Sequence, residues 1–80
     1  KARPSDVLPR ETIMASVLKV IEVLAESDKS WEDAAALAVE RAGKTLHGIK
    51  SIYIKNFEAK VENNKIVKYR IDANISFVLD

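Results

Sequence analysis

Apolar residues occupy every second position over a long stretch near the end of the chain. Polar residues stand between the apolar ones as far as Ser76. The apolar members of the series are Val67, Tyr69, Ile71, Ala73, Ile75, Phe77 and Leu79. A period of two is typical of a β-strand with one buried and one exposed face. The pattern therefore predicts a strand over residues 67–79, about 40 Å long at roughly 3.4 Å per residue.

Two further strands are predicted. The run over residues 16–25 is apolar and rich in β-branched residues, which favours a first strand. A second strand is predicted over residues 50–62, where the apolar positions change phase near Lys55 and Asn56. A β-bulge there explains the change, because one inserted residue moves later side chains to the opposite face. Asn63 and Asn64 then predict a tight turn, since asparagine tolerates positive φ.

One helix is predicted between the first two strands. Ser30 can accept a hydrogen bond from the amide of Asp33, while the Asp33 carboxylate reaches back, as in a capping box. The helix is expected to run to about Leu46, and Gly48 is expected to end it in the left-handed conformation. Its predicted buried stripe is Trp31, Ala35, Ala38, Ala42 and Leu46. We interpret Trp31 as a packing residue rather than a residue that stacks on a cofactor.

The predicted elements give an α+β fold of order β-α-β-β, with a three-stranded antiparallel sheet partly wrapped around one helix. The predicted helix covers about 24 Å at 1.5 Å per residue, which is much less than the 40 Å strand. One chain therefore cannot cover its own strand. The sequence predicts that the remaining apolar surface meets another copy or a ligand.

Composition narrows the function classes. The chain has 80 residues, no cysteine, and 13 Lys and Arg against 12 Asp and Glu, with the two signs interleaved. This balance disfavours nucleic-acid binding, and no apolar run is long enough to span a membrane. The cysteine-free composition fits a reducing cytoplasm, which is the location we expect. No Ser-His-acid set, Gly-rich phosphate loop or EF-hand spacing is present, so we expect no enzyme.

The segment before Met14 differs from the rest of the chain. Residues 1–13 contain Pro4 and Pro9, scattered charges and no periodicity. We interpret this leader as an expression scar or an upstream extension, and residues 14–80 as a single domain. An ordered arm that crosses to a neighbouring chain is the alternative.

Several segments together resemble the dodecin family of small flavin-binding and flavin-storage proteins. These segments are Lys19-Val20-Ile21-Glu22, Ser30-Trp31-Glu32-Asp33-Ala34, Ala42-Gly43-Lys44-Thr45-Leu46, Tyr69-Arg70-Ile71 and Ile75-Ser76-Phe77. The resemblance implies the fold described above and a homododecamer of cubic symmetry that encloses a hollow space.

The chain departs from the flavin-binding members at two positions. Ser51 stands where they carry a Trp that stacks on the isoalloxazine, and Arg70 stands where they carry a Gln that bonds the ring edge. Tyr53 would lie on the same side of the strand as Ser51 and is a candidate substitute. The chain is similar to the branch that lacks this Trp, in which some members are associated with calcium.

We therefore predict a non-enzymatic, dodecin-like shell that binds or sequesters a small ligand, with weak or lost flavin affinity. The candidate ligand-binding residues are Ser51, Tyr53 and Arg70, and Arg70 would pair with an acid of a neighbouring chain or hold a phosphate or carboxylate. Flavin (FMN, FAD or riboflavin) and calcium are the candidate cofactors by resemblance, and no metal site is assigned. The alternatives are a true flavin storage protein, with Tyr53 replacing the Trp, and a β-edge protein-interaction module.

Overall fold

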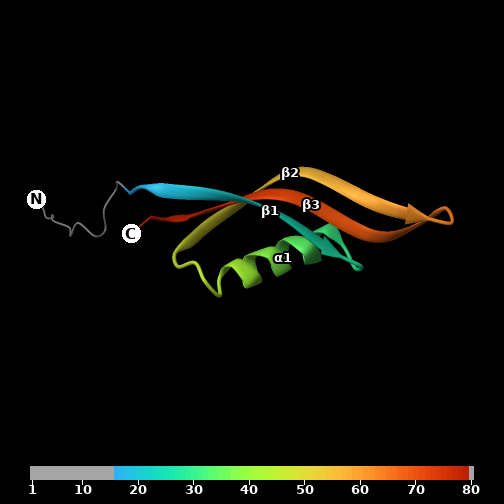
Figure 1. Cartoon of the computed structure of the whole chain (residues 1–80), viewed down its shortest axis with the longest axis horizontal. Helices are drawn as coiled ribbons and strands as arrows, with labels where there is room; N and C mark the ends of the chain where they lie inside the picture. The colour runs from blue at the N-terminus through green and yellow to red at the C-terminus, as the bar shows by residue number, and fades with distance from the viewer. Residues whose placement is uncertain (1–15, 80) are drawn as a thin grey trace, which may run out of the picture.

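The computed structural model describes residues 16–79, and it contains one helix and three strands in the predicted order (Figure 1). They are β1 (Leu18–Ser27), α1 (Trp31–Ala42), β2 (Ile49–Glu62) and β3 (Lys65–Val78). The strand order is β1-β3-β2, and both pairs are antiparallel. The predicted α+β fold and its topology are confirmed. The predicted leader over residues 1–13 lies outside the described residues.

The core lies between the centre of β3 and α1. Its buried apolar side chains are Ile71, Ala73 and Ile75 of β3 and Ala34 and Ala38 of α1. The alternation of β3 is confirmed at its centre, but the predicted end residues Val67 and Leu79 are 38% and 50% exposed. The predicted stripe of α1 omitted Ala34, which is fully buried, and included Ala35, which is only partly buried. Small alanines let the helix approach the sheet closely, which leaves little core volume.

Ser30 begins α1 as predicted, but the rest of the capping arrangement differs. Its Oγ accepts a hydrogen bond from the Asp33 amide at 2.9 Å. The Asp33 carboxylate does not reach back to the Ser30 amide and instead accepts from Ser27 Oγ at 2.6 Å. Ser27 Oγ in turn accepts from the amide of Lys29 at 2.9 Å. The buried Ser27 therefore joins the end of β1 to the first turn of the helix.

The predicted end of the helix was wrong. α1 ends at Ala42, and Gly43 follows as its C-cap with right-handed φ and ψ, its amide donating to the carbonyl of Val39 at 2.9 Å. Glycine is a poor helix former, so the alanine-rich pattern does not carry the helix to Leu46. Gly48 does have a positive φ of 68°, but it serves the entry into β2, because a β-carbon there would lie 3.3 Å from Val78 Cβ.

The bulge and the turn are confirmed. The pairing of β2 with β3 shifts register between Ile54 and Asn56, which is where the apolar phase changes. Asn63 and Asn64 have φ values of 53° and 64°, and they join β2 to β3. Two positive φ values in a two-residue loop match the twist of a hairpin.

α1 covers only part of the sheet. Its 12 residues span about 18 Å, whereas the 14 residues of β3 span about 46 Å at roughly 3.3 Å per residue. Figure 1 shows the β2–β3 hairpin continuing past the start of the helix. The helix found in residues 16–79 is not long or apolar enough to cross a membrane.

Candidate functional site

The three predicted site residues all lie on the face of the sheet that points away from α1, which we call the outer face. This follows from strand register, because Ser51, Tyr53 and Arg70 alternate with residues that face the helix. The outer face also carries Glu22, Leu24, Glu26, Glu58, Lys60, Lys68, Asp72, Asn74 and Ser76. The face is therefore mainly polar, with charged side chains along its middle.

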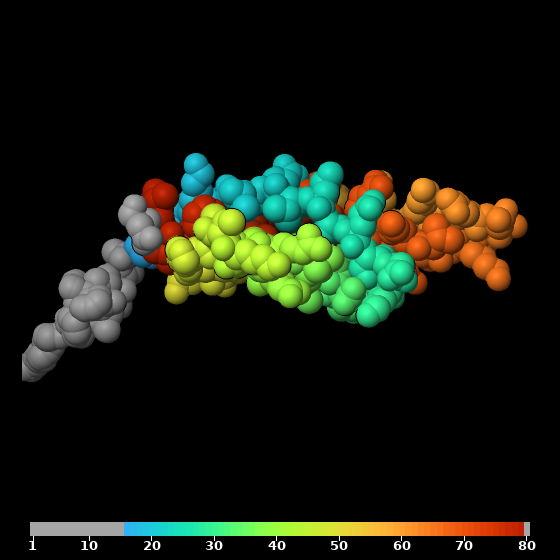
Figure 2. All heavy atoms as spheres, turned by 60° about the horizontal axis from the view of Figure 1, so that its bottom comes forward, coloured from blue at the N-terminus to red at the C-terminus, as the bar shows by residue number. Residues whose placement is uncertain are grey.

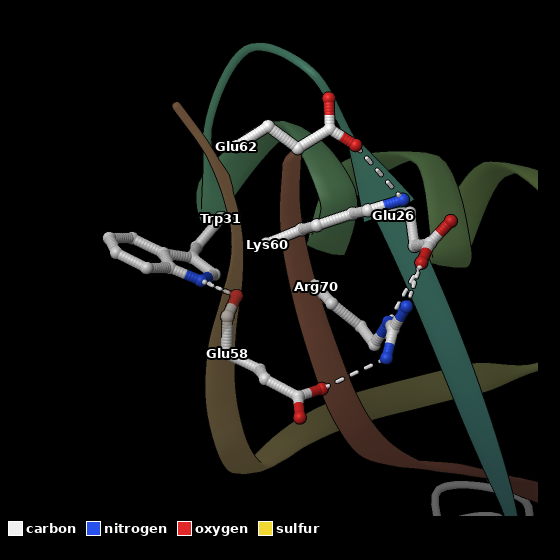
Figure 3. Close-up of polar contacts among 6 residues, drawn as sticks. All are labelled: Glu26, Trp31, Glu58, Lys60, Glu62 and Arg70. Atoms are coloured by element: carbon white, nitrogen blue, oxygen red, sulfur yellow. Dashed lines mark hydrogen bonds and ion pairs between the residues drawn. The ribbon is translucent and has the colours of Figure 1, made fainter. Parts of the chain in front are cut away.

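Arg70 lies at the centre of an ion-pair network. Its Nε and Nη2 donate to Glu26 Oε2 at 2.7 and 2.6 Å, and its Nη1 donates to Glu58 Oε1 at 3.2 Å. Figure 3 shows the guanidinium between these two carboxylates, one from β1 and one from β2. The hydrogen bonds from Arg70 lower the pKa of Glu26, and those to Glu26 raise the pKa of Arg70. The sequence led us to expect that Arg70 would pair with an acid of a neighbouring chain or with a ligand. In the structure, the strand register places two acids of the same chain, Glu26 and Glu58, beside Arg70.

A second charged row crosses the three strands beside this network. Lys55 Nζ lies 3.0 Å from Glu22 Oε2, and this contact raises the pKa of Lys55. A hydrogen bond between the Asp72 and Glu22 side chains raises the pKa of Asp72 and lowers that of Glu22. Asp72 Oδ1 is buried and has no hydrogen-bond partner among the described residues.

Sequence reasoning found no carboxylate pair, so this row is a functional candidate that it missed. The only signal in the sequence was the alternation of inward and outward positions, which we call parity. It places both Glu22 and Asp72 at outward positions of their strands. Parity does not say which residues are neighbours across the sheet, and register supplies that information.

Ser51 and Tyr53 lie together at the other end of the outer face. Ser51 Oγ and Ser76 Oγ are 2.6 Å apart, and Tyr53 pairs with Asn74 and is 67% exposed. Arg70 stands four residues along β3 from Asn74, which corresponds to about 14 Å. One chain therefore brings Ser51 and Tyr53 together but does not bring Arg70 to them.

Trp31 is held by packing, as predicted. Its indole meets Phe57 and Tyr69 edge to face, with ring centroids 5.8 and 4.9 Å apart. Its Nε1 donates to the Glu58 carbonyl at 2.9 Å (Figure 3). These contacts fix the first turn of α1 against β2 and β3.

Shallow grooves adjoin Arg70 on the outer face. One has a volume of about 330 Å³ and is lined by Glu26, Glu58, Ala59, Lys60, Lys68 and Arg70. Another of about 360 Å³ extends from Arg70 to Asp72 and Leu24. Lys60 and Lys68 are direct cross-strand partners, and Lys60 also pairs with Glu62 at 3.5 Å (Figure 3). Such a surface suits polar contacts with a small molecule or another chain.

Residues 16–79 contain no group of three or more His, Cys, Asp and Glu side chains placed to hold a metal ion. Ca²⁺ takes six to eight oxygen ligands.

Sequence comparison identifies relatives over nearly the whole described chain. The sequence model of the family described as Dodecin matches residues 17–80. A protein named calcium dodecin from Mycobacterium tuberculosis is 37% identical over 62 residues, which is 78% of this chain and 87% of that protein.

Structural comparison agrees. The crystal structure of that calcium dodecin, described as having a novel calcium-binding site, matches with a TM-score of 0.71 and 35% identity, covering 81% of this chain and 93% of the other. The dodecin from Streptomyces coelicolor has a TM-score of 0.79 at 20% identity, with 85% and 97% covered. The dodecin from Streptomyces davaonensis has a TM-score of 0.76 at 18% identity, with 81% and 96% covered. At 18% and 20% identity, the two Streptomyces proteins show only that the fold is shared.

Proposed function

Because this chain belongs to the dodecin family, we propose that it forms a homododecameric shell in the cytoplasm that binds or sequesters a small ligand without catalysing a reaction. The observation that carries the proposal is exposed apolar surface on the helix side of the sheet. Phe57, Val61 and Ile66 are 64%, 59% and 49% exposed there, where α1 does not cover them. Soluble monomers rarely leave large contiguous apolar surface exposed, so further copies of the chain are expected to cover it.

Flavin binding is proposed to be weak or lost. Ser51 offers no aromatic face for an isoalloxazine, and its hydroxyl is already bonded to Ser76. Arg70 directs its donors to Glu26 and Glu58, so an anionic ligand would have to displace a carboxylate. These contacts support a ligand other than flavin.

Calcium is the cation that the relatives suggest. The oxygen of Asp72 without a partner supports an outer-face contribution to such a site, with further ligands from other chains. Calcium titration of the assembled protein by isothermal calorimetry tests this: a saturable heat that Asp72→Asn removes would support it. An absent heat, or one unchanged in the variant, would exclude calcium coordination by Asp72.

True flavin storage is the second candidate, because Tyr53 is exposed on the same face as Ser51. A β-edge interaction module is the third, because β1 and β2 are both edge strands. Native mass spectrometry with riboflavin titration separates the three. A twelve-chain particle that leaves riboflavin fluorescence unquenched supports the main proposal. Strong quenching of riboflavin fluorescence supports flavin storage, and a stable monomer rejects the shell.

A further inference from the structure

The groove of about 330 Å³ on the outer face holds more positive than negative charge. Its charged lining residues are Lys60, Lys68, Arg70, Glu26 and Glu58. Both carboxylates are bonded to Arg70, and these three groups together carry one negative charge. The two lysines add two positive charges, so the groove as a whole has one net positive charge.

The two lysines are direct cross-strand partners. Lys60 of β2 lies opposite Lys68 of β3, and like charges in such a pair destabilise the sheet. The ion pair of Lys60 with Glu62, at 3.5 Å, contributes little, because both of its side chains are more than half exposed. Lys68 has no ion pair within residues 16–79. An anion between the two ammonium groups would offset their repulsion.

Arg70 does not hold its two acids equally. Glu26 Oε2 accepts hydrogen bonds from Nε and Nη2 at 2.7 and 2.6 Å, and the Glu26 side chain is 38% exposed. Glu58 Oε1 accepts one hydrogen bond, from Nη1 at 3.2 Å, and the Glu58 side chain is 63% exposed. The two carboxylates lie on opposite sides of the guanidinium (Figure 3). Glu58 can therefore leave Arg70 with the smaller loss of contact.

We propose that this groove binds a phosphate group between Lys60, Lys68 and Nη1 of Arg70, and that the Glu58 carboxylate takes the place of the phosphate at Nη1 when the groove is empty. The inference rests on the proposed ligand-binding function and names the chemical class of the ligand. A phosphate monoester carries about two negative charges near pH 7 and offers three acceptor oxygens, which match three cationic donors. A carboxylate carries one charge and has two oxygens, so it would leave one of the three donors unmatched.

Glu58 sets the affinity of the groove in this arrangement. An incoming phosphate has to displace the Glu58 carboxylate from Arg70, and the displaced carboxylate repels the phosphate from nearby. Removal of the charge at position 58 should therefore strengthen phosphate binding, whereas removal of either lysine should weaken it. All residues of the groove belong to one chain, so the site does not require a neighbouring copy.

Titration of the assembled protein with inorganic phosphate at constant ionic strength, followed by isothermal calorimetry, tests the site. Glu58→Gln is expected to tighten phosphate binding about fivefold, which is the upper range for the loss of one exposed ion pair. Glu40→Gln is the matched control and should change the affinity less than twofold. It makes the same change of charge on α1, which covers the opposite face of the sheet and is turned toward the viewer in Figure 2.

The lysines are tested in the Glu58→Gln background. Adding Lys68→Ala should weaken phosphate binding at least fivefold. Adding Lys50→Ala, which removes the same charge at the other end of β2, should change it less than twofold. Glycerol phosphate as a second probe distinguishes the two sources of the group. Tighter binding than inorganic phosphate supports an organic phosphate as the ligand, and equal binding supports the free ion.

Two results would overturn the inference. One is the absence of saturable phosphate binding to Glu58→Gln, and the other is equal tightening by Glu40→Gln, which would show a general effect of net charge. Native mass measured on the same samples separates this inference from the proposed shell. An assembled particle that binds no phosphate overturns the groove and leaves the shell standing. A single chain that binds phosphate overturns the shell and leaves the groove standing.

Discussion

Replacing Ser51 with Trp tests whether the outer face retains the form of a flavin site. Ser51 is exposed, so an indole can be placed there without displacing a buried side chain. The substitution removes the 2.6 Å contact with Ser76 Oγ, and the net loss for one such hydrogen bond is about 1 kcal/mol. The folded chain and its assembly are therefore expected to survive.

The expected gain in flavin affinity follows from two contacts. Stacking of aromatic rings contributes about 0.5–1.5 kcal/mol, which corresponds to roughly 2- to 13-fold tighter binding. Adding Arg70→Gln supplies an amide for the ring edge, which must come from a neighbouring copy because position 70 lies about 14 Å from the Ser51 region of the same chain, and a hydrogen bond contributes a similar amount. The double variant should therefore bind riboflavin roughly 5- to 150-fold more tightly than the parent chain.

The assay is quenching of riboflavin fluorescence during titration, with native mass measured on the same samples. Ser51→Leu is the matched control, because it adds apolar volume without an aromatic face. Equal riboflavin affinity in the Trp and Leu variants, with assembly intact in both, would refute the assignment of Ser51 to a flavin-stacking position.

Three further predictions concern the fold and its charges. Ile75→Asp should destabilise the chain by more than about 3 kcal/mol in urea unfolding, because Ile75 is fully buried and the new charge has no partner. Trp31→Phe should cost about 1 kcal/mol in the same assay, because it keeps a ring but loses the hydrogen bond to β2. Stability should fall on acidification below the ordinary Glu pKa of 4.5, because the Glu26 pKa is lowered by Arg70 in the folded state only. Arg70→Gln should reduce the fall in melting temperature on acidification in a pH series of thermal melts. An unchanged dependence of melting temperature on pH would contradict the attribution of the lowered Glu26 pKa to Arg70.

Most of the fold followed from local pattern. Alternation with a period of two depends on side chains two residues apart, so it predicted β3 and the phase change at the bulge. The turn followed from the backbone preference of Asn63 and Asn64. The end of α1 did not follow, because alanine spacing continues past Ala42 while Gly43 and the geometry of entry into β2 stop the helix.

The site was less accessible from sequence, because its contacts depend on register. Parity predicted that Ser51 and Tyr53 share a face, and the structure confirms this. The acids beside Arg70 lie 44 and 12 residues away in the chain, and no local pattern links them to it. The pairing of Glu22 with Asp72 was missed for the same reason.

The Arg70 network affects how the outer face can take part in an assembly. An unpaired guanidinium that is buried between copies would cost several kcal/mol, and a ligand phosphate is one way to offset that cost. Here Glu26 and Glu58 already neutralise it within one chain, so the face can be covered by another copy without such a ligand. An incoming anion would have to compete with two carboxylates held on neighbouring strands. The pairing of Arg70 with these two acids therefore favours assembly without a phosphate-bearing ligand at this position.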